Sequence, residues 1–293
     1  MRFDSSDRTD TSQIDDRRGG GGGAKVLGGG LGLLGVLAIA AFKWMSGDRM
    51  GAVQTAVEGV KGQQQQAPAG DQAPPSSLEG SCEGASSKVD SAKFNACVQS
   101  NVQSFWRGAL KERYEPAKMV YFTGKTTSPC GAAEASSGPF YCPGDHQVYL
   151  DVEFFKDLQS KLGAKGGDFA EAYVIAHEYG HHIQSLLGTE RKVRGLQARA
   201  SKIESNALSV KMELQADCYA GAWGHAAFAG GKVDKAEIAD ALDAAAAVGD
   251  DSIQKKMTGT VRPETFSHGS SADRQKWFMI GMESGDYTKC ETF

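Results

Sequence analysis

The pattern H-E-x-x-H at residues 177–181 constrains this chain more than any other feature, because it predicts both a helix and a metal site. On a helix, His177 and His181 lie one turn apart on the same face, so both imidazoles can bind a single Zn²⁺. Glu178 lies beside them, where its carboxylate can take a proton from a metal-bound water. We therefore expect a helix over residues 168–187 that carries two metal ligands and a general base.

A second predicted helix, residues 204–223, supplies the acids that such a site needs. Glu213 and Asp217 are four residues apart and therefore share one helix face. A catalytic zinc usually has three protein ligands and one open position, and a carboxylate can be the third ligand. We predict Glu213 as that ligand and Asp217 as the acceptor for the N–H of a ligand imidazole. The alternative is that both acids lie on a solvated helix face.

Composition narrows the class of protein. The 293 residues carry a formal net charge of −4 and contain six cysteines. Without a basic stripe, nucleic acid is not expected as a partner. An even, small number of cysteines suits an exported domain with a few disulfides, whereas a cysteine-rich zinc site would need a C-x-x-C spacing that is absent. Proximity along the chain favours the pairs Cys82–Cys97 and Cys130–Cys142, which leaves Cys218 and Cys290 as the third pair.

The first 80 residues differ in composition from the rest of the chain. Residues 1–25 are polar and Gly-rich, which predicts a disordered cytoplasmic tail. Residues 26–45 are apolar except for Lys43, which predicts a transmembrane signal anchor; a cleaved signal peptide and a buried helix are the alternatives. Residues 46–80 predict a flexible linker, and residues 81–293 one folded domain. Basic residues are denser before the apolar run, which predicts a cytoplasmic N-terminus and an extracytoplasmic domain at the cytoplasmic membrane.

Local patterns within the domain predict its fold class. Alternating runs predict strands over residues 118–123 and 147–152, and the Ser-, Gly- and Pro-rich residues 126–144 predict a long loop between them. Helical patterns cover residues 89–98, 102–110, 154–162, 168–187, 204–223, 234–248 and 272–283. We expect an α+β fold with a small, mostly antiparallel sheet before the active-site helix and a helical C-terminal half, with the metal in the cleft between them.

Longer strings around both motifs resemble one bacterial family. The strings are GPFYCP at 138–143, VYLD at 148–151, HEYGHHIQ at 177–184, ELQADCYAG at 213–221 and FSHG at 266–269. With the predicted anchor, they resemble the bacterial "putative neutral zinc metallopeptidases", and H-E-x-x-H followed by E-x-x-x-D resembles the gluzincin branch of zinc peptidases. The resemblance implies a zincin-like fold, one Zn²⁺ per chain, and hydrolysis of peptide bonds with Glu178 as general base.

The resemblance also suggests further site residues. The oxyanion needs a donor besides zinc, and thermolysin-like enzymes use a distant C-terminal histidine, so His268 is one candidate and Tyr219 the alternative. Arg274 is a candidate to orient a carboxylate, or else an ordinary surface arginine. In zincins an edge strand beside the active-site helix binds substrate, which suggests Val148–Val152, although an interior strand is the alternative.

These expectations combine into a membrane-anchored zinc endopeptidase that acts on protein or peptide substrates outside the cytoplasmic membrane. A non-catalytic, zinc-stabilised binding or scaffold module at the cell envelope is an alternative. Hydrolysis of cell-wall peptide cross-links is another. Glu178 favours an enzyme, because a structural metal site has no use for a general base.

Overall fold

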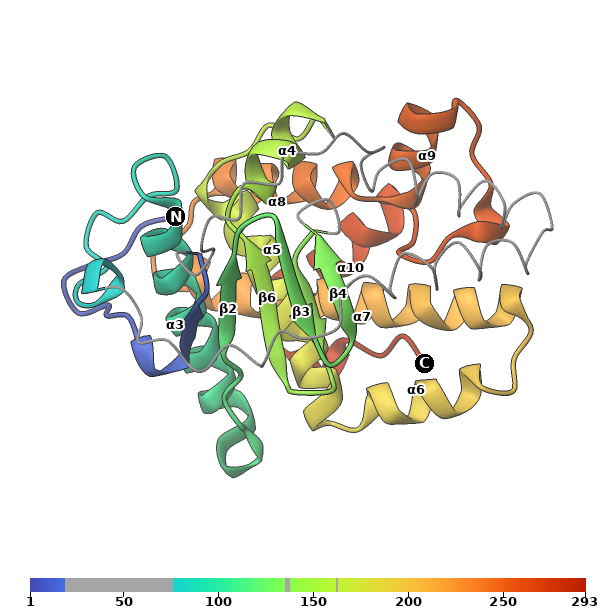
Figure 1. Cartoon of the computed structure of the whole chain (residues 1–293), viewed down its shortest axis with the longest axis horizontal. Coiled ribbons are helices and arrows are strands. Elements are labelled where there is room, and N and C mark those ends of the chain that lie inside the picture. Colours follow the sequence, from blue (N-terminus) through green and yellow to red (C-terminus); the bar gives the residue numbers. More distant parts are fainter. Residues whose placement is uncertain (19–75, 135–137, 162) are drawn as a thin grey trace, which may run out of the picture. The chain divides into compact units, whose positions relative to one another are not determined.

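Helices make up most of the computed structural model, which describes residues 1–18, 76–134, 138–161 and 163–293 (Figure 1). All described residues belong to one unit of the chain. Its helices are α3 (Ser91–Leu110), α4 (Phe154–Ser160), α5 (Asp168–Leu186), α6 (Thr189–Gln197), α7 (Lys202–Ala229), α8 (Lys235–Ala247), α9 (Asp250–Thr258) and α10 (Ser271–Ser284). Two predicted helices merge into α3, because no glycine or proline separates their apolar runs.

The strands of the main sheet run mostly parallel, which corrects the predicted mostly antiparallel sheet. The order is β1 (Ile14–Asp16), β2 (Met119–Phe122), β6 (Gln147–Asp151) and β5 (Phe140–Cys142). β1–β2 and β2–β6 are parallel pairs, and β5–β6 is antiparallel. Parallel neighbours need a long crossover connection, which residues 123–146 provide between β2 and β6.

The crossover itself contains strands that were not predicted. β3 (Lys125–Ser128) and β4 (Gly131–Glu134) form an antiparallel hairpin, and β5 follows them. All three overlap residues 126–144, where the sequence predicts a loop. The Lys-Thr-Thr-Ser sequence of β3 has no apolar residue, so it lacks the alternation by which strands are predicted.

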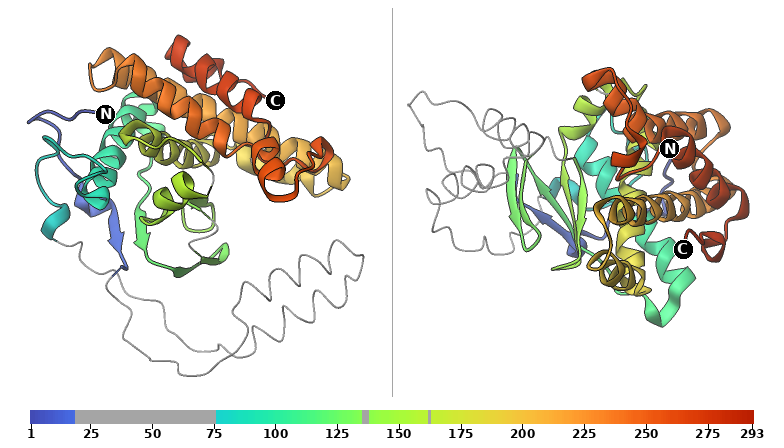
Figure 2. Two further views of the ribbon diagram at one scale, coloured as in Figure 1. Left: turned by 90° about the horizontal axis from the view of Figure 1, so that it is seen from above. Right: turned by 90° about the vertical axis from the view of Figure 1, so that its right-hand side faces the viewer.

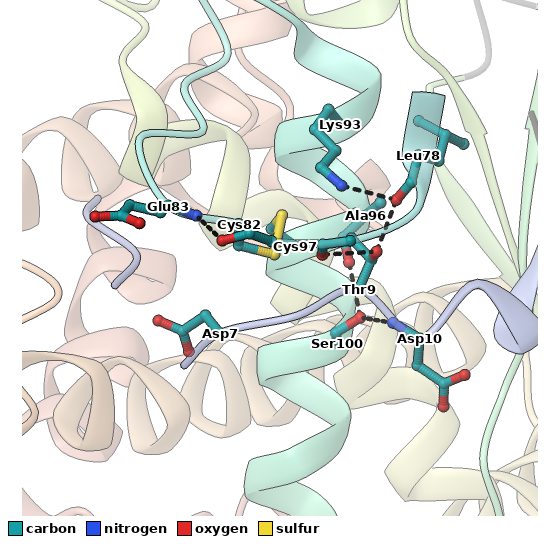
Figure 3. Close-up of a disulfide and its surroundings, with 12 residues drawn as sticks. Asp7, Thr9, Asp10, Leu78, Cys82, Glu83, Lys93, Ala96, Cys97 and Ser100 are labelled. Atoms are coloured by element: carbon teal, nitrogen blue, oxygen red, sulfur yellow. Dashed lines mark hydrogen bonds between the residues drawn. A yellow bond between two sulfur atoms is a disulfide. The ribbon is translucent and has the colours of Figure 1, made fainter. Parts of the chain in front are cut away.

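Residues 1–18, which we call the N-terminal arm, are folded against the domain rather than disordered as predicted. The side chains of Met1 and Phe3 are buried, and β1 lies parallel to β2. In Figure 3 the arm passes the Cys82–Cys97 disulfide, where Thr9 Oγ1 donates a hydrogen bond of 2.7 Å to the Leu78 carbonyl. The arm therefore contributes a strand to the same sheet as the domain, and the predicted localisation stays a prediction.

The predicted transmembrane helix also needs correction. Within the part of the chain that the structure describes, no helix is long and apolar enough to cross a membrane. The predicted anchor at 26–45, and residues 46–75 of the predicted linker at 46–80, lie outside the described residues. The last residues of that predicted linker belong to the domain, because Leu78 is fully buried.

Helix α5 lies at the centre of the domain and packs against α3, α7, α8 and the sheet. Figure 2 shows the helices gathered mainly on one side of the strands. Gly180 on α5 lets α7 approach closely, because a Cβ atom there would lie 2.9 Å from the Ala216 carbonyl oxygen. This close packing brings the H-E-x-x-H pattern next to Glu213 and Asp217. The expected disulfides Cys82–Cys97, Cys130–Cys142 and Cys218–Cys290 are present.

Candidate metal centre

Three side chains from two helices converge on one point. His177 and His181 come from α5 and Glu213 from α7, and one ligand atom of each lies within 4.8 Å of the others. His177 Nε2 is 3.2 Å from Glu213 Oε2, and His181 Nε2 is 3.5 Å from Glu213 Oε1. Tetrahedral ligands about 2.0–2.1 Å from a zinc ion lie about 3.3 Å from one another. The donor set and its spacing therefore fit Zn²⁺.

Asp217 contacts the ring nitrogen of His177 that faces away from the candidate metal position. Its carboxylate is fully buried, and Oδ1 lies 2.8 Å from His177 Nδ1. A carboxylate at this distance accepts the Nδ1 proton, so Nε2 presents its lone pair to the metal. The predicted role of Asp217 matches this geometry.

Arg274 and Tyr173 complete the surroundings of Asp217. Arg274 Nε donates to Asp217 Oδ2 at 2.8 Å, and Arg274 Nη2 donates to Oδ1 at 2.9 Å. Tyr173 donates its hydroxyl proton to the same Oδ1 at 2.6 Å. Arg274 is thus buried and orients a carboxylate, rather than lying on the surface. Tyr173 was not predicted, although it lies one turn before His177 on the same helix face.

Charge compensation sets the protonation of these groups when no metal is bound. Burial opposes the charged form of His177, but Asp217 and Glu213 outweigh it and raise its pKa to about 10. Burial likewise opposes ionisation of Glu213, but His181 and His177 hold the pKa of its carboxyl well below the usual range. Metal binding must therefore displace protons from the histidines, which makes affinity depend on pH.

Glu178 faces a cavity of about 550 Å³ that the metal ligands also line. Its carboxylate accepts a hydrogen bond from the backbone N–H of Tyr141 on β5. Burial raises the pKa of Glu178, and the charge of Glu213 adds to this, while His177 and His181 oppose it. A raised carboxyl pKa suits a general base, because proton transfer is most efficient near the working pH.

His268 also lines this cavity, from the loop before α10. Asp250, the first residue of α9, organises that loop: its Oδ2 accepts the backbone N–H groups of Ser267, His268 and Gly269 at 2.6–3.0 Å. Asp250 Oδ1 lies 3.1 Å from His268 Nδ1, and this hydrogen bond raises the pKa of His268 despite partial burial. Asp250 was missed, because no local spacing links it to a loop 18 residues later.

Tyr219, the alternative oxyanion donor, lies elsewhere. Its ring packs in the core against Trp106 and Tyr287, at centroid distances of 5.5 and 6.4 Å. It is buried and is not among the residues that line the cavity. Of the two predicted candidates, only His268 is placed to reach a substrate.

The predicted substrate strand needs a correction. β6, which contains Val148, lies between β2 and β5, so it is the interior strand that was the alternative. The strand at this edge of the sheet is β5, and its residues Phe140 and Tyr141 line the cavity. Single strands give no signal of their order in a sheet, which explains the error.

Comparison with known proteins identifies the family. A family model described as "Putative neutral zinc metallopeptidase" matches residues 2–293. The chain belongs to this family. The matched range begins within the N-terminal arm, and the family implies zinc as the metal.

Relatives in the zinc metallopeptidase family come from distant bacteria. The chain is 46% identical over 207 residues to "Uncharacterized protein YpfJ" of Escherichia coli (strain K12), covering 70% of this chain and 72% of YpfJ. It is 43% identical over 221 residues to "Uncharacterized protein Rv2575" of Mycobacterium tuberculosis (strain ATCC 25618 / H37Rv), covering 70% and 73%. No solved structure matches the chain.

Proposed function

We propose that the protein is a zinc-dependent endopeptidase that hydrolyses peptide bonds in proteins or peptides, with Glu178 as general base. The observation that carries this proposal is that the three ligands and Glu178 open together into one cavity. Structural zinc sites usually have four protein ligands and are closed, whereas catalytic sites keep one position open. Three protein ligands beside a cavity match the catalytic arrangement.

In the proposed reaction, the metal, Glu178 and His268 each have a separate role. Zinc, when bound, supplies a Lewis acid that polarises a peptide carbonyl and acidifies a water. Glu178 accepts the proton of the attacking water and delivers it to the leaving amine. His268, kept oriented by Asp250, donates a hydrogen bond to the oxygen on which negative charge develops. Its raised pKa favours the charged imidazolium, which can donate from both nitrogens.

The cavity and the edge strand suggest how a substrate binds. An extended peptide can add to β5 through backbone hydrogen bonds, and β5 runs along the cavity. Apart from the site residues, most of the cavity wall is apolar: Pro139, Phe140, Pro143, Phe154, Val174, Met212, Val248 and Ile253. We therefore propose cleavage next to a large apolar side chain.

Three disulfides support a site of action outside the cytoplasm. Disulfides persist in oxidising compartments and are rare in the cytosol.

The test compares the parent chain with Glu178→Gln, using zinc content and an unbiased peptide library. We expect about one zinc per chain in both, with cleavage only by the parent. Glu190→Gln is the matched control, because Glu190 lines the same cavity but pairs with Arg194 instead of the metal ligands. Zinc-loaded parent chain that cuts no peptide faster than Glu178→Gln would refute the proposal.

A further inference from the structure

The second histidine, His181, has a different kind of support from His177. Its Nδ1 lies 2.9 Å from Oε1 of Gln184, a neutral amide that is fully buried. Gln184 Nε2 donates in turn to the Met212 carbonyl at 2.7 Å. Because a carbonyl can only accept, this bond determines which end of the Gln184 amide faces His181. His181 must then donate from Nδ1, which leaves the Nε2 lone pair for the metal.

The same amide is connected to the C-terminus. Gln184 Nε2 lies 3.1 Å from Gln215 Oε1, and Gln215 Nε2 donates to the Cys290 carbonyl at 2.8 Å. Cys290 is bonded to Cys218, and both cysteines are buried. A continuous path of polar contacts therefore runs from a metal ligand to a disulfide on α7, beside Asp217.

The residues after α10 also hold the turn of α7 that carries the third ligand. Thr292 Oγ1 donates to the Lys211 carbonyl at 2.8 Å, and Cys290 contacts Gln215. These two attachments lie two residues before and two residues after Glu213. We define residues 287–293 as the C-terminal segment. It contacts the turn of α7 that carries Glu213, and it is connected to His181 through the side-chain amides of Gln215 and Gln184.

We propose that Gln184 and Gln215 are positioning residues for the metal ligand His181, and that the C-terminal segment, held by Cys218–Cys290, anchors them. Loss of either glutamine link or of the disulfide then lowers zinc affinity, although no ligand is changed. Such outer partners of ligand histidines typically contribute about 10–100-fold to metal affinity. The inference rests on the proposed zinc site but not on proteolysis.

The test measures zinc affinity of the full chain by competition with a chelating indicator, together with thermal unfolding of the metal-free chain. We expect Gln215→Met to weaken zinc binding about ten-fold, because methionine fills the space but makes no link to Cys290. The double variant Cys218→Ser/Cys290→Ser should weaken it similarly. The control is Cys82→Ser/Cys97→Ser, since that disulfide lies against the N-terminal arm (Figure 3) and should affect stability only.

Two variants at Gln184 separate positioning from a merely structural role. Gln184→Glu keeps an acceptor for His181 but loses the donor to Met212, so it should lower thermal stability and leave zinc affinity equal to the parent or tighter. Gln184→Met should lower both. Zinc affinity within two-fold of the parent in folded Gln215→Met and Gln184→Met would overturn the inference, whatever the folding of the cysteine variants. Tight zinc binding without any peptide cleavage would refute the proposed function and leave this inference standing.

Discussion

Glu171 makes the stability of the protein depend on pH in a way that can be calculated. This carboxyl lies in the first turn of α5, with 6% of its surface exposed, and accepts a hydrogen bond of 3.3 Å from Ser91. Burial raises its pKa to about 7, Asp168 adds to this, and hydrogen bonds from Ser87 and Ser91 oppose it. The ordinary value is 4.5.

Whether stability rises or falls with pH depends on which state, folded or unfolded, binds the proton of Glu171 more tightly. Because the folded state holds this proton more tightly than the unfolded state, Glu171 contributes stability at low pH and loses it as pH rises towards 7. With about 1.4 kcal/mol per pH unit, the loss between pH 5 and pH 8 is about 2.5 kcal/mol. Gln cannot ionise and keeps the hydrogen-bonding shape, so Glu171→Gln should remove this loss.

The assay is chemical denaturation of the parent chain and Glu171→Gln at pH 5 and pH 8. We expect the variant to gain about 2.5 kcal/mol relative to the parent between the two pH values. Glu112→Gln makes the same chemical change at an exposed carboxylate and serves as the control. A relative gain of less than about 1 kcal/mol for Glu171→Gln would show that the carboxyl is not held protonated by burial.

Two further predictions concern the site. Arg274→Met should destabilise the metal-free chain by about 3–5 kcal/mol in denaturation, because it leaves the Asp217 carboxylate buried without its main countercharge; a loss under about 1 kcal/mol would contradict this. His268→Ala should lower kcat about 10²–10³-fold with little change in KM, if His268 contacts only the developing oxyanion. His225→Ala is its control, since His225 bonds the Met282 carbonyl and does not line the cavity. A proportional rise in KM would assign His268 to substrate binding instead.

The candidate metal site could be predicted because its geometry is local. His177 and His181 are one helical turn apart, as are Glu213 and Asp217, so each pair required only a correct helix. The meeting of the two helices depends on Gly180, which the sequence alone could not relate to Ala216. Gln184 was accessible by the same reasoning, since it lies three residues after His181, but glutamine is seldom considered near a metal.

The wrong or missing predictions concern residues that lie far apart in the sequence but meet in the fold. Asp250 and His268 meet through loop geometry, and strands of three to five residues carry no information on direction or order. The N-terminal arm was missed for a related reason. Its composition predicts disorder, yet a few apolar side chains and backbone hydrogen bonds suffice once an existing sheet offers an edge.

The two edge strands of the sheet, β1 and β5, differ in their relation to the site. Exposed edges invite unwanted strand pairing, and proteins protect them with short strands and charged residues. β1 is the edge strand on the β2 side; it has only three residues and ends in Asp15 and Asp16, which pair with Arg17 and Arg18. The opposite edge is β5, which lies along the cavity and supplies the backbone N–H that contacts Glu178. Of the two edge strands, β5 is the one that lies along the cavity, and we propose that it receives a peptide next to the proposed base.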